Sequence, residues 1–100
     1  MGATFLRIEK FIWDEDKYIV NAKKHGITFE EASTVFDDDN ALYSNDDEHS
    51  LGEERFKVIG YSNLARMLMV CHCCRNGDSL IRIISARKAT KQEAKLYGGV

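Results

Sequence analysis

Leu80 to Tyr97 reads L-I-R-I-I-S-A-R-K-A-T-K-Q-E-A-K-L-Y, a stretch that passes from one element directly into another. The branched apolar residues around Arg82 predict a β-strand over residues 80–86. Thr90 and Glu93 have the spacing of a capping box, which predicts that a helix begins at Thr90. The C-terminal part of the chain is therefore predicted to be a strand followed closely by a helix.

The same stretch carries cationic side chains where the strand meets the helix. Arg82, Arg87 and Lys88 are the residues concerned. Cationic groups at a strand end, beside the start of a helix, suit an anionic ligand such as phosphate. The alternative is that they are solvated charges at the end of a strand, since most exposed charges do nothing specific.

Toward the N-terminus, residues 5–13 (F-L-R-I-E-K-F-I-W) predict a first strand. A helix is then predicted to begin after Asp14, which is a favourable N-cap residue. With Asp14 as N-cap, Trp13 and Tyr18 occupy the two positions of a hydrophobic staple. Gly26 is suited to end this helix in the left-handed conformation.

The middle of the chain predicts a second helix and then strands. Thr28 and Glu31 form another capping-box pattern, and the polar run 37–40 (D-D-D-N) ends the helix. The element order β-α-α-β-β-β-β-α predicts an α+β domain, in which an antiparallel sheet has helices on one side. The remaining strands are predicted over residues 41–44, 55–61 and 67–74, with a hairpin turn built on the Asn-Gly pair of residues 75–78.

The length and composition are those of one ordinary globular domain. The chain has 100 residues, 44% of them hydrophobic, and residues 1–100 are expected to form a single domain. No apolar run approaches the length of a membrane span, and the N-terminus lacks the long apolar region of a secretory signal. A cytoplasmic protein without a membrane segment is therefore expected.

The net charge of −2 hides a marked asymmetry between the two halves of the chain. Residues 1–50 carry twelve acidic and five basic side chains, whereas residues 51–100 carry four acidic and nine basic ones. A basic second half suits nucleic acid or an acidic partner. An internally compensated dipolar domain is the alternative.

All three cysteines lie within the run V-C-H-C-C at residues 70–74. An odd, clustered set argues against a disulfide framework and for a reducing cytosol. Cys71 and Cys73 should share one face of a strand, with His72 on the other. Because a structural zinc site needs four convergent ligands, we expect these cysteines to belong to the core and to bind no metal.

Four segments of the chain form a recognisable pattern: F-I-W-D-E-D-K (11–17), K-H-G-I-T-F-E-E-A-S-T-V-F-D-D (24–38), E-H-S-L-G-E-E-R-F-K-V-I-G-Y-S (48–62) and R-I-I-S-A-R-K-A-T-K-Q-E (82–93). They cover nearly all of the chain from Phe11 to Tyr97, and in order and spacing they resemble the BrnT toxin family. This resemblance implies a RelE-like fold and a cytosolic endoribonuclease that is the toxin of a type II toxin–antitoxin pair. The implied partner is a BrnA-like antitoxin, which neutralises the toxin, binds operator DNA and represses the operon.

RNA cleavage without a metal or other cofactor needs positive charge to stabilise the phosphorane-like transition state. Arginine suits this role because it stays charged and binds phosphate bidentately. We therefore select Arg55, Arg82 and Arg87 as catalytic candidates. Arg82 and Arg87 are separated by an odd number of residues, so a regular strand would place them on opposite faces. They share a face only if the chain bends near Ser85 or Ala86, or if Arg87 lies past the strand end.

The reaction also needs a base for the 2′-hydroxyl proton and an acid for the 5′-oxygen. Histidine suits both roles because its ordinary pKa lies near neutrality. His49, in a polar loop before the Arg55 strand, is the candidate, and a solvated loop histidine is the alternative. His25 is expected to end the first helix, where its cationic form interacts favourably with the negative end of the helix dipole. His72 is expected in the core.

Further RNA contacts are expected on the same basic surface. Lys57 shares a strand face with Arg55, and Lys88 follows Arg87 directly. Tyr97 could stack on a base, although such an aromatic residue more often packs its own helix.

One departure from the family pattern motivates an alternative function. Many members have a T-E-R-like segment where this chain has Cys73-Cys74-Arg75, and the total charge is acidic. The alternative is a catalytically weakened binding module that retains antitoxin binding and operon autoregulation. Growth arrest on induced expression would separate the two.

Overall fold

A computed structural model describes residues 10–50, 52–75 and 79–97. The element order agrees with the order predicted from the sequence. The predicted strand residues 5–9 and the turn residues 76–78 lie outside the described part. The elements are β1 (Lys10–Trp13), α1 (Glu15–His25), α2 (Phe29–Ser33), η1 (Thr34–Asp37), β2 (Leu42–Asn45), η2 (Asp47–His49), β3 (Phe56–Tyr61), β4 (Met67–Arg75), β5 (Leu80–Lys88) and α3 (Lys91–Leu96).

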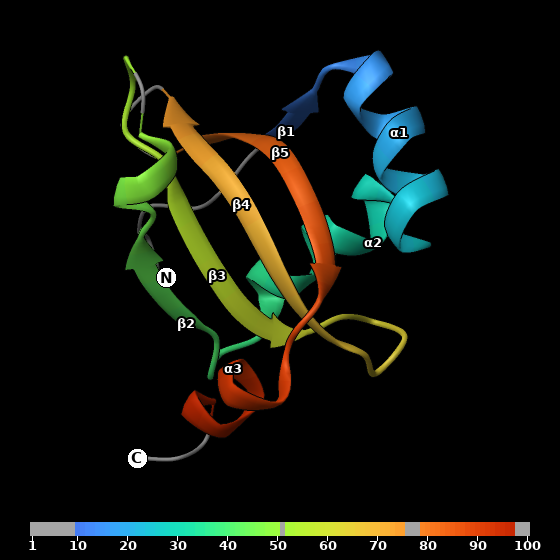
Figure 1. Ribbon diagram of the computed structural model, residues 1–100, viewed down its shortest axis with the longest axis vertical. Helices are drawn as coiled ribbons and strands as arrows, with labels where there is room; N and C mark the ends of the chain where they lie inside the picture. The colour runs from blue at the N-terminus through green and yellow to red at the C-terminus, as the bar shows by residue number, and fades with distance from the viewer. Residues whose placement is uncertain (1–9, 51, 76–78, 98–100) are drawn as a thin grey trace, which may run out of the picture.

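The five strands form one mixed sheet in the order β1-β5-β4-β3-β2 (Figure 1). The pairs β2–β3, β3–β4 and β4–β5 are antiparallel, as predicted. The expectation of a wholly antiparallel sheet is wrong for β1, which runs parallel to β5. Parallel strands need a long crossover, and the whole chain between β1 and β5 supplies it. The α+β class is confirmed, while the RelE-like antiparallel description holds only approximately.

The first helix begins and ends as the sequence predicts. The Asp14 carboxylate accepts hydrogen bonds from the backbone N–H groups of Asp16 (2.8 Å) and Lys17 (3.2 Å). The rings of Trp13 and Tyr18 lie 5.9 Å apart, which confirms the staple. Gly26 ends the helix with φ of 71°, a conformation that glycine adopts without steric cost.

The second helix has only half of its predicted capping box. The Thr28 hydroxyl accepts from the Glu31 N–H at 3.1 Å, but the Glu31 side chain does not return to Thr28. Its carboxylate binds Arg66 (Nε at 2.9 Å) and the Ser62 hydroxyl (2.7 Å) instead. The Arg66 guanidinium lowers the pKa of Glu31, so the carboxylate stays charged. Glu31 therefore ties α2 to the β3–β4 turn.

One face of the sheet carries the main hydrophobic core. Figure 1 shows α2 and η1 behind the sheet, so the helices cover this face, while α1 flanks β5 and α3 lies at the end of the sheet. None of the described helices is long and apolar enough to cross a membrane. The buried core residues are Ile27, Phe29, Ala32, Val35, Val58, Leu68, Val70, Ile81, Ile83 and Ala86.

His72 lies on this core face and is 2% exposed, which confirms its predicted core position. Its ring packs edge-on against Phe36, with the ring centroids 4.8 Å apart, and Tyr43 and Phe56 lie close by. Burial lowers the pKa of His72 to about 4. The imidazole is therefore neutral and structural at neutral pH.

A buried asparagine connects α1 to the sheet. The Asn21 amide donates to the Ala86 carbonyl (2.9 Å) and the Ile27 carbonyl (3.0 Å), and its oxygen accepts from the Ala86 N–H (3.0 Å). β1 ends at Trp13, opposite Ile83, so it does not reach Ala86. Beyond that point Asn21 supplies both hydrogen bonds that a neighbouring strand would make.

Candidate functional site

A β-bulge interrupts the pairing of β5 with β4. Cys71 lies opposite Ser85, and the next residue, His72, lies opposite Ile83. Ile84 is therefore an extra residue on β5. A bulge of this kind bends the strand and shifts its side-chain alternation by one residue.

This shift brings the two arginines of β5 to the same face of the sheet. Arg82 lies opposite Cys73 and Arg87 lies opposite Met69, and these two β4 residues share parity. The face in question is the one that the core helices leave open. The bend near Ser85, which the sequence set as the condition for a shared face, is confirmed.

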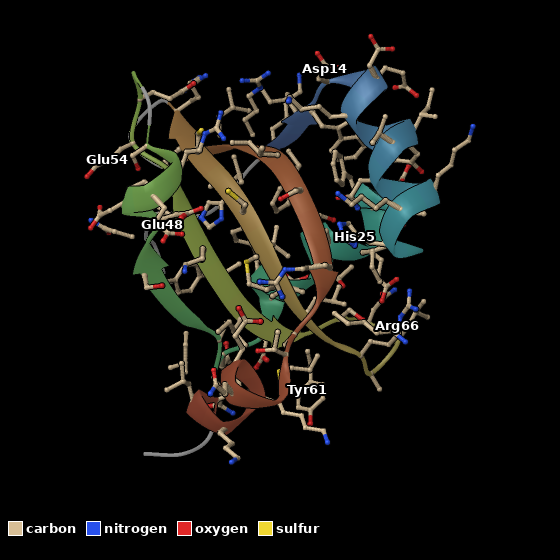
Figure 2. The ribbon with its side chains drawn as sticks, viewed as in Figure 1. Asp14, His25, Glu48, Glu54, Tyr61 and Arg66 are labelled. Carbon is tan, nitrogen blue, oxygen red and sulfur yellow. The ribbon has the colours of Figure 1, made fainter. Side chains whose placement is uncertain are left out.

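A hollow of about 220 Å³ lies on this open face. Figure 2 shows side chains spread over the same side of the sheet, with His25 labelled where α1 meets it. Arg55, just before β3, is half-buried here, and its Nε atom is buried with no hydrogen-bond partner among the described residues. The lining residues are Asp46, Arg55, Met69, Cys71, Ile84, Ser85 and Arg87.

Arg87 is held in place by Glu93 of α3. Its two terminal nitrogens donate to the two carboxylate oxygens at 2.8 and 2.9 Å, a bidentate pair. Glu93 also accepts from the Thr90 N–H at 2.9 Å, which completes the predicted capping box. Arg87 lowers the pKa of Glu93 to about 2. The guanidinium is thus fixed at the rim of the hollow with part of its charge compensated.

Arg82 is in a different state. The part of the chain that the structure describes offers its guanidinium no hydrogen bond or ion pair. The pKa of Glu53 is lowered chiefly by the hydrogen bond from Arg75 and, more weakly, by the charge of Arg82. Arg82 therefore differs from Arg87 in having no carboxylate bound to its guanidinium, and it is not among the residues that line the hollow.

The floor of the open face is made of buried thiols. Cys71 is 5% exposed and Cys73 is fully buried, which confirms that these are core cysteines. Burial raises the pKa of Cys71 to about 11 and also raises that of Cys73. The Cys71 thiol contacts the buried carboxylate of Asp46 at 3.5 Å. Among the described residues no group of histidine, cysteine and acidic side chains is arranged to hold a metal.

The three residues predicted to contact RNA do not line this hollow. Lys57 lies opposite Cys71, on the open face, whereas Lys88 lies opposite Leu68 and so has the alternation of the core face. Tyr97 donates its hydroxyl to Asp38 at 2.7 Å and packs edge-on against Tyr61.

The histidine candidate is described only through its backbone. His49 is the last residue of η2 (Asp47–His49), and its side chain lies outside the described part of the structure. η2 follows directly after Asp46, which lines the hollow, so the backbone of His49 lies three residues along the chain from a lining residue.

Sequence reasoning missed three contributors to this site. Asp46 was one of several acids in a polar loop, and nothing local marked it as buried. Glu93 was recognised as a capping residue, but its pairing with Arg87 was not. Ser85 was named only as the place of a bend, although it lines the hollow itself.

The fold is a mixed-sheet α+β domain, and its open face, with arginines over neutral thiols, suits an anionic ligand such as RNA. Residues 13–93 match the family described as "Ribonuclease toxin, BrnT, of type II toxin-antitoxin system". The chain belongs to this BrnT family of ribonuclease toxins.

A solved structure supports this assignment. The crystal structure of the Brucella abortus ribonuclease toxin BrnT is similar with a TM-score of 0.61 and 26% sequence identity. The similarity covers 83% of this chain and 99% of that one. A search of curated proteins finds no significant match. Both the fold and the toxin family predicted from the sequence are therefore confirmed.

Proposed function

We propose that this protein is an endoribonuclease that cleaves RNA without a metal ion and so inhibits translation and growth in the cytoplasm. The observation that carries the proposal is the bulge at Ile84. Because of it, Arg82 lies on the same open face as Arg87, which lines the hollow together with Arg55, so an RNA strand bound across this face would meet all three arginines.

In the proposed reaction the 2′-oxygen of a ribose attacks the adjacent phosphorus, and the bond to the 5′-oxygen breaks. Negative charge builds on the phosphoryl oxygens in the transition state. Guanidinium groups placed before the reaction stabilise that charge without reorganisation. Arg82, which has no partner among the described residues, is assigned the largest share, and Arg55 and Arg87 bind the flanking oxygens.

Proton transfer is assigned to His49, as base or acid. Its position three residues after Asp46, which lines the hollow, supports this role. His72 is unsuited because burial lowers its pKa to about 4 and apolar rings surround it. Lys57 lies on the same face as the arginines and is assigned to RNA binding, whereas Lys88 and Tyr97 would meet RNA only beyond the hollow.

The proposed partner is a BrnA-like antitoxin that covers this basic face and contacts operator DNA itself. An acidic or amphipathic antitoxin segment would complement the arginines electrostatically. Operator DNA would then be bound through the antitoxin alone.

The test is RNA cleavage by purified protein in the presence of EDTA. Wild-type protein should cleave, and Arg82→Ala should lose about 10²-fold or more in kcat/KM while its unfolding curve is unchanged. Lys95→Ala, on the exposed face of α3, is the control and should keep full activity. A magnesium requirement would refute the metal-free mechanism, and full activity of Arg82→Ala would refute the site.

Induced expression in cells tests the toxin function separately. Growth arrest that co-expressed antitoxin relieves is expected. Healthy growth with soluble, folded protein would instead favour the binding module without catalysis.

A further inference from the structure

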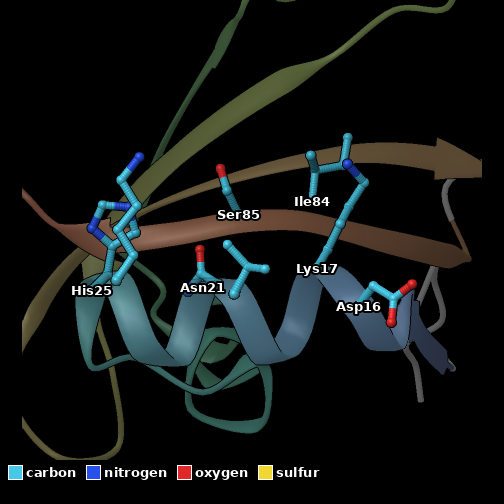
Figure 3. A pocket seen from close by; sticks show the side chains of 8 residues that line it. Asp16, Lys17, Asn21, His25, Ile84 and Ser85 are labelled. Carbon is cyan, nitrogen blue, oxygen red and sulfur yellow. The ribbon is translucent and has the colours of Figure 1, made fainter.

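A second hollow, of about 420 Å³, lies between α1 and β5. Figure 3 shows the side chains of Lys17 and His25 extending from α1 toward the strand, on either side of Ser85. We call this hollow the α1–β5 groove. Its lining residues are Asp16, Lys17, Val20, Asn21, Lys24, His25, Ile84 and Ser85.

The groove is continuous with the hollow of the open face. Ile84 and Ser85 line both of them, because the bulge puts these two residues at the ridge between α1 and the sheet. An extended ligand bound at Arg55 and Arg87 can therefore cross β5 at Ser85 and continue along α1 without leaving the surface.

The charge of the groove is mainly positive. Lys17, Lys24 and His25 supply cationic or hydrogen-bonding groups, and Asp16 at the far end is the only acid that lines it among the described residues. The described hydrogen bonds and ion pairs engage none of the three basic side chains. They are thus available for phosphate.

The groove is also built on a fixed framework. Asn21 lines the groove and holds α1 against β5 through two hydrogen bonds to the backbone of Ala86 (2.9 and 3.0 Å), and a third hydrogen bond, to the Ile27 carbonyl (3.0 Å), fixes the chain after α1. Because this connection is buried, the distance between the α1 lysines and the β5 ridge is set before any ligand binds. Preorganisation of this kind lowers the cost of binding.

We propose that the α1–β5 groove binds the phosphate backbone of the RNA beside the cleaved phosphodiester, with Lys24 as the main contact. The proposal rests on the ribonuclease function and extends its substrate site from the sheet onto α1. Single-stranded RNA is the ligand class that suits a basic groove leading away from the site of cleavage.

An alternative explanation of Lys24 is that it only stabilises the helix, since lysines near a C-terminus favour the helix dipole. Lys23 provides the matched comparison. It lies in the same last turn of α1 and is exposed, but it does not line the groove. A dipole effect would be shared by both lysines, whereas RNA contact belongs to Lys24 alone.

The first experiment measures binding of a fully 2′-O-methylated oligoribonucleotide, which cannot be cleaved because it lacks the attacking hydroxyl. Fluorescence anisotropy over a salt series should show Lys24→Ala weakened about 3–10-fold, with the salt slope reduced by about 0.7. Lys23→Ala should bind like wild-type protein. Equal effects of the two variants, or absence of binding by wild-type protein, would overturn the proposal.

The second experiment separates this proposal from the ribonuclease function itself. Lys24→Ala should lose kcat/KM on a long RNA, mainly through KM, but keep wild-type activity on a dinucleotide that cannot reach α1. A wild-type protein that binds RNA in the groove without cleaving any would refute the ribonuclease function and leave the groove intact. Equal losses on both substrates would refute the groove.

Discussion

The two faces of the sheet differ in what they contribute to the molecule. The core face carries Leu68 and Val70, which are fully buried beneath the helices, with His72 as its polar exception. The open face carries arginines over buried thiols, with Arg87 as the member that is tied to Glu93. The main hydrophobic core lies on the first face and the proposed RNA site on the second, although the same three strands build both.

The bulge at Ile84 is what makes this division complete. Without the extra residue, regular alternation would place Arg82 and Arg87 on opposite faces. One of the two charges would then lie against the apolar core, where an unpaired charge is costly. A single inserted residue thus keeps the core face apolar and collects the charges on the open face.

The largest effect is expected on the core face. Leu68→Ala should lower the free energy of unfolding by about 2–5 kcal/mol, because it leaves a cavity in a closely packed core. At a low temperature at which Leu68→Ala is still folded, this variant should keep its ribonuclease activity. Arg82→Ala is the counterpart, with stability within about 0.5 kcal/mol of wild type. Urea denaturation measures the stability of both variants. A comparable loss in Leu68→Ala and Arg82→Ala would contradict the assignment of stability to the core face.

A smaller effect comes from the polar exception on the core face. His72 is neutral in the folded protein because burial lowers its pKa to about 4. In the unfolded chain a histidine takes up a proton below about pH 6.5, so stability should fall as the pH drops from about 6.5 toward 4.

His72→Phe should remove that part of the pH dependence. The difference between the unfolding free energies at pH 7 and pH 5 should shrink by about 1–2 kcal/mol relative to wild type. An unchanged difference would show that His72 is not held neutral in the folded state.

The smallest effect is expected at the tied arginine of the open face. Glu93→Gln removes the charge that holds Arg87 but leaves an amide oxygen to accept from Thr90, so α3 keeps its cap. Stability should fall by about 1 kcal/mol at pH 7, since the pair is only partly buried. RNA binding should not fall, because Arg87 keeps its charge.

The effect of Glu93→Gln on stability is expected to depend on pH. Glu93 contributes stability above the ordinary glutamate pKa of about 4.3, and this contribution is lost as the pH falls toward about 2. The difference in free energy of unfolding between Glu93→Gln and wild type should therefore disappear as the pH falls across that acidic range. Glu54→Gln, at an exposed position before β3, is the control and should match wild type throughout. Matching deficits in the two variants would contradict the pairing.

Features that depend on neighbouring residues were predictable from the sequence. The caps at Asp14, Thr28 and Thr90 involve partners two or three residues away, and all three were predicted correctly. The parity of Arg82 and Arg87 likewise follows from spacing along one strand, so the need for a bend near Ser85 could be stated before the bend was seen.

Features that depend on distant residues were not predictable. The Glu31 side chain accepts a hydrogen bond from Arg66, 35 residues later, and not from the backbone N–H of Thr28. A charged arginine forms a stronger hydrogen bond with a carboxylate than a backbone N–H does. The parallel pairing of β1 with β5 joins strands about 70 residues apart. The α1–β5 groove depends on Asn21 reaching Ala86 across 65 residues. No local pattern in the sequence contains these partners.

Asn21 also bears on how the protein behaves at high concentration. Beyond Ile83, the edge of β5 that faces away from β4 is paired with no strand among the described residues, and an open strand edge is a template on which another chain can extend the sheet. The Asn21 amide already occupies the N–H and C=O of Ala86 that such a chain would need. One buried side chain therefore keeps a central strand, whose outer edge would otherwise be free, from seeding self-association.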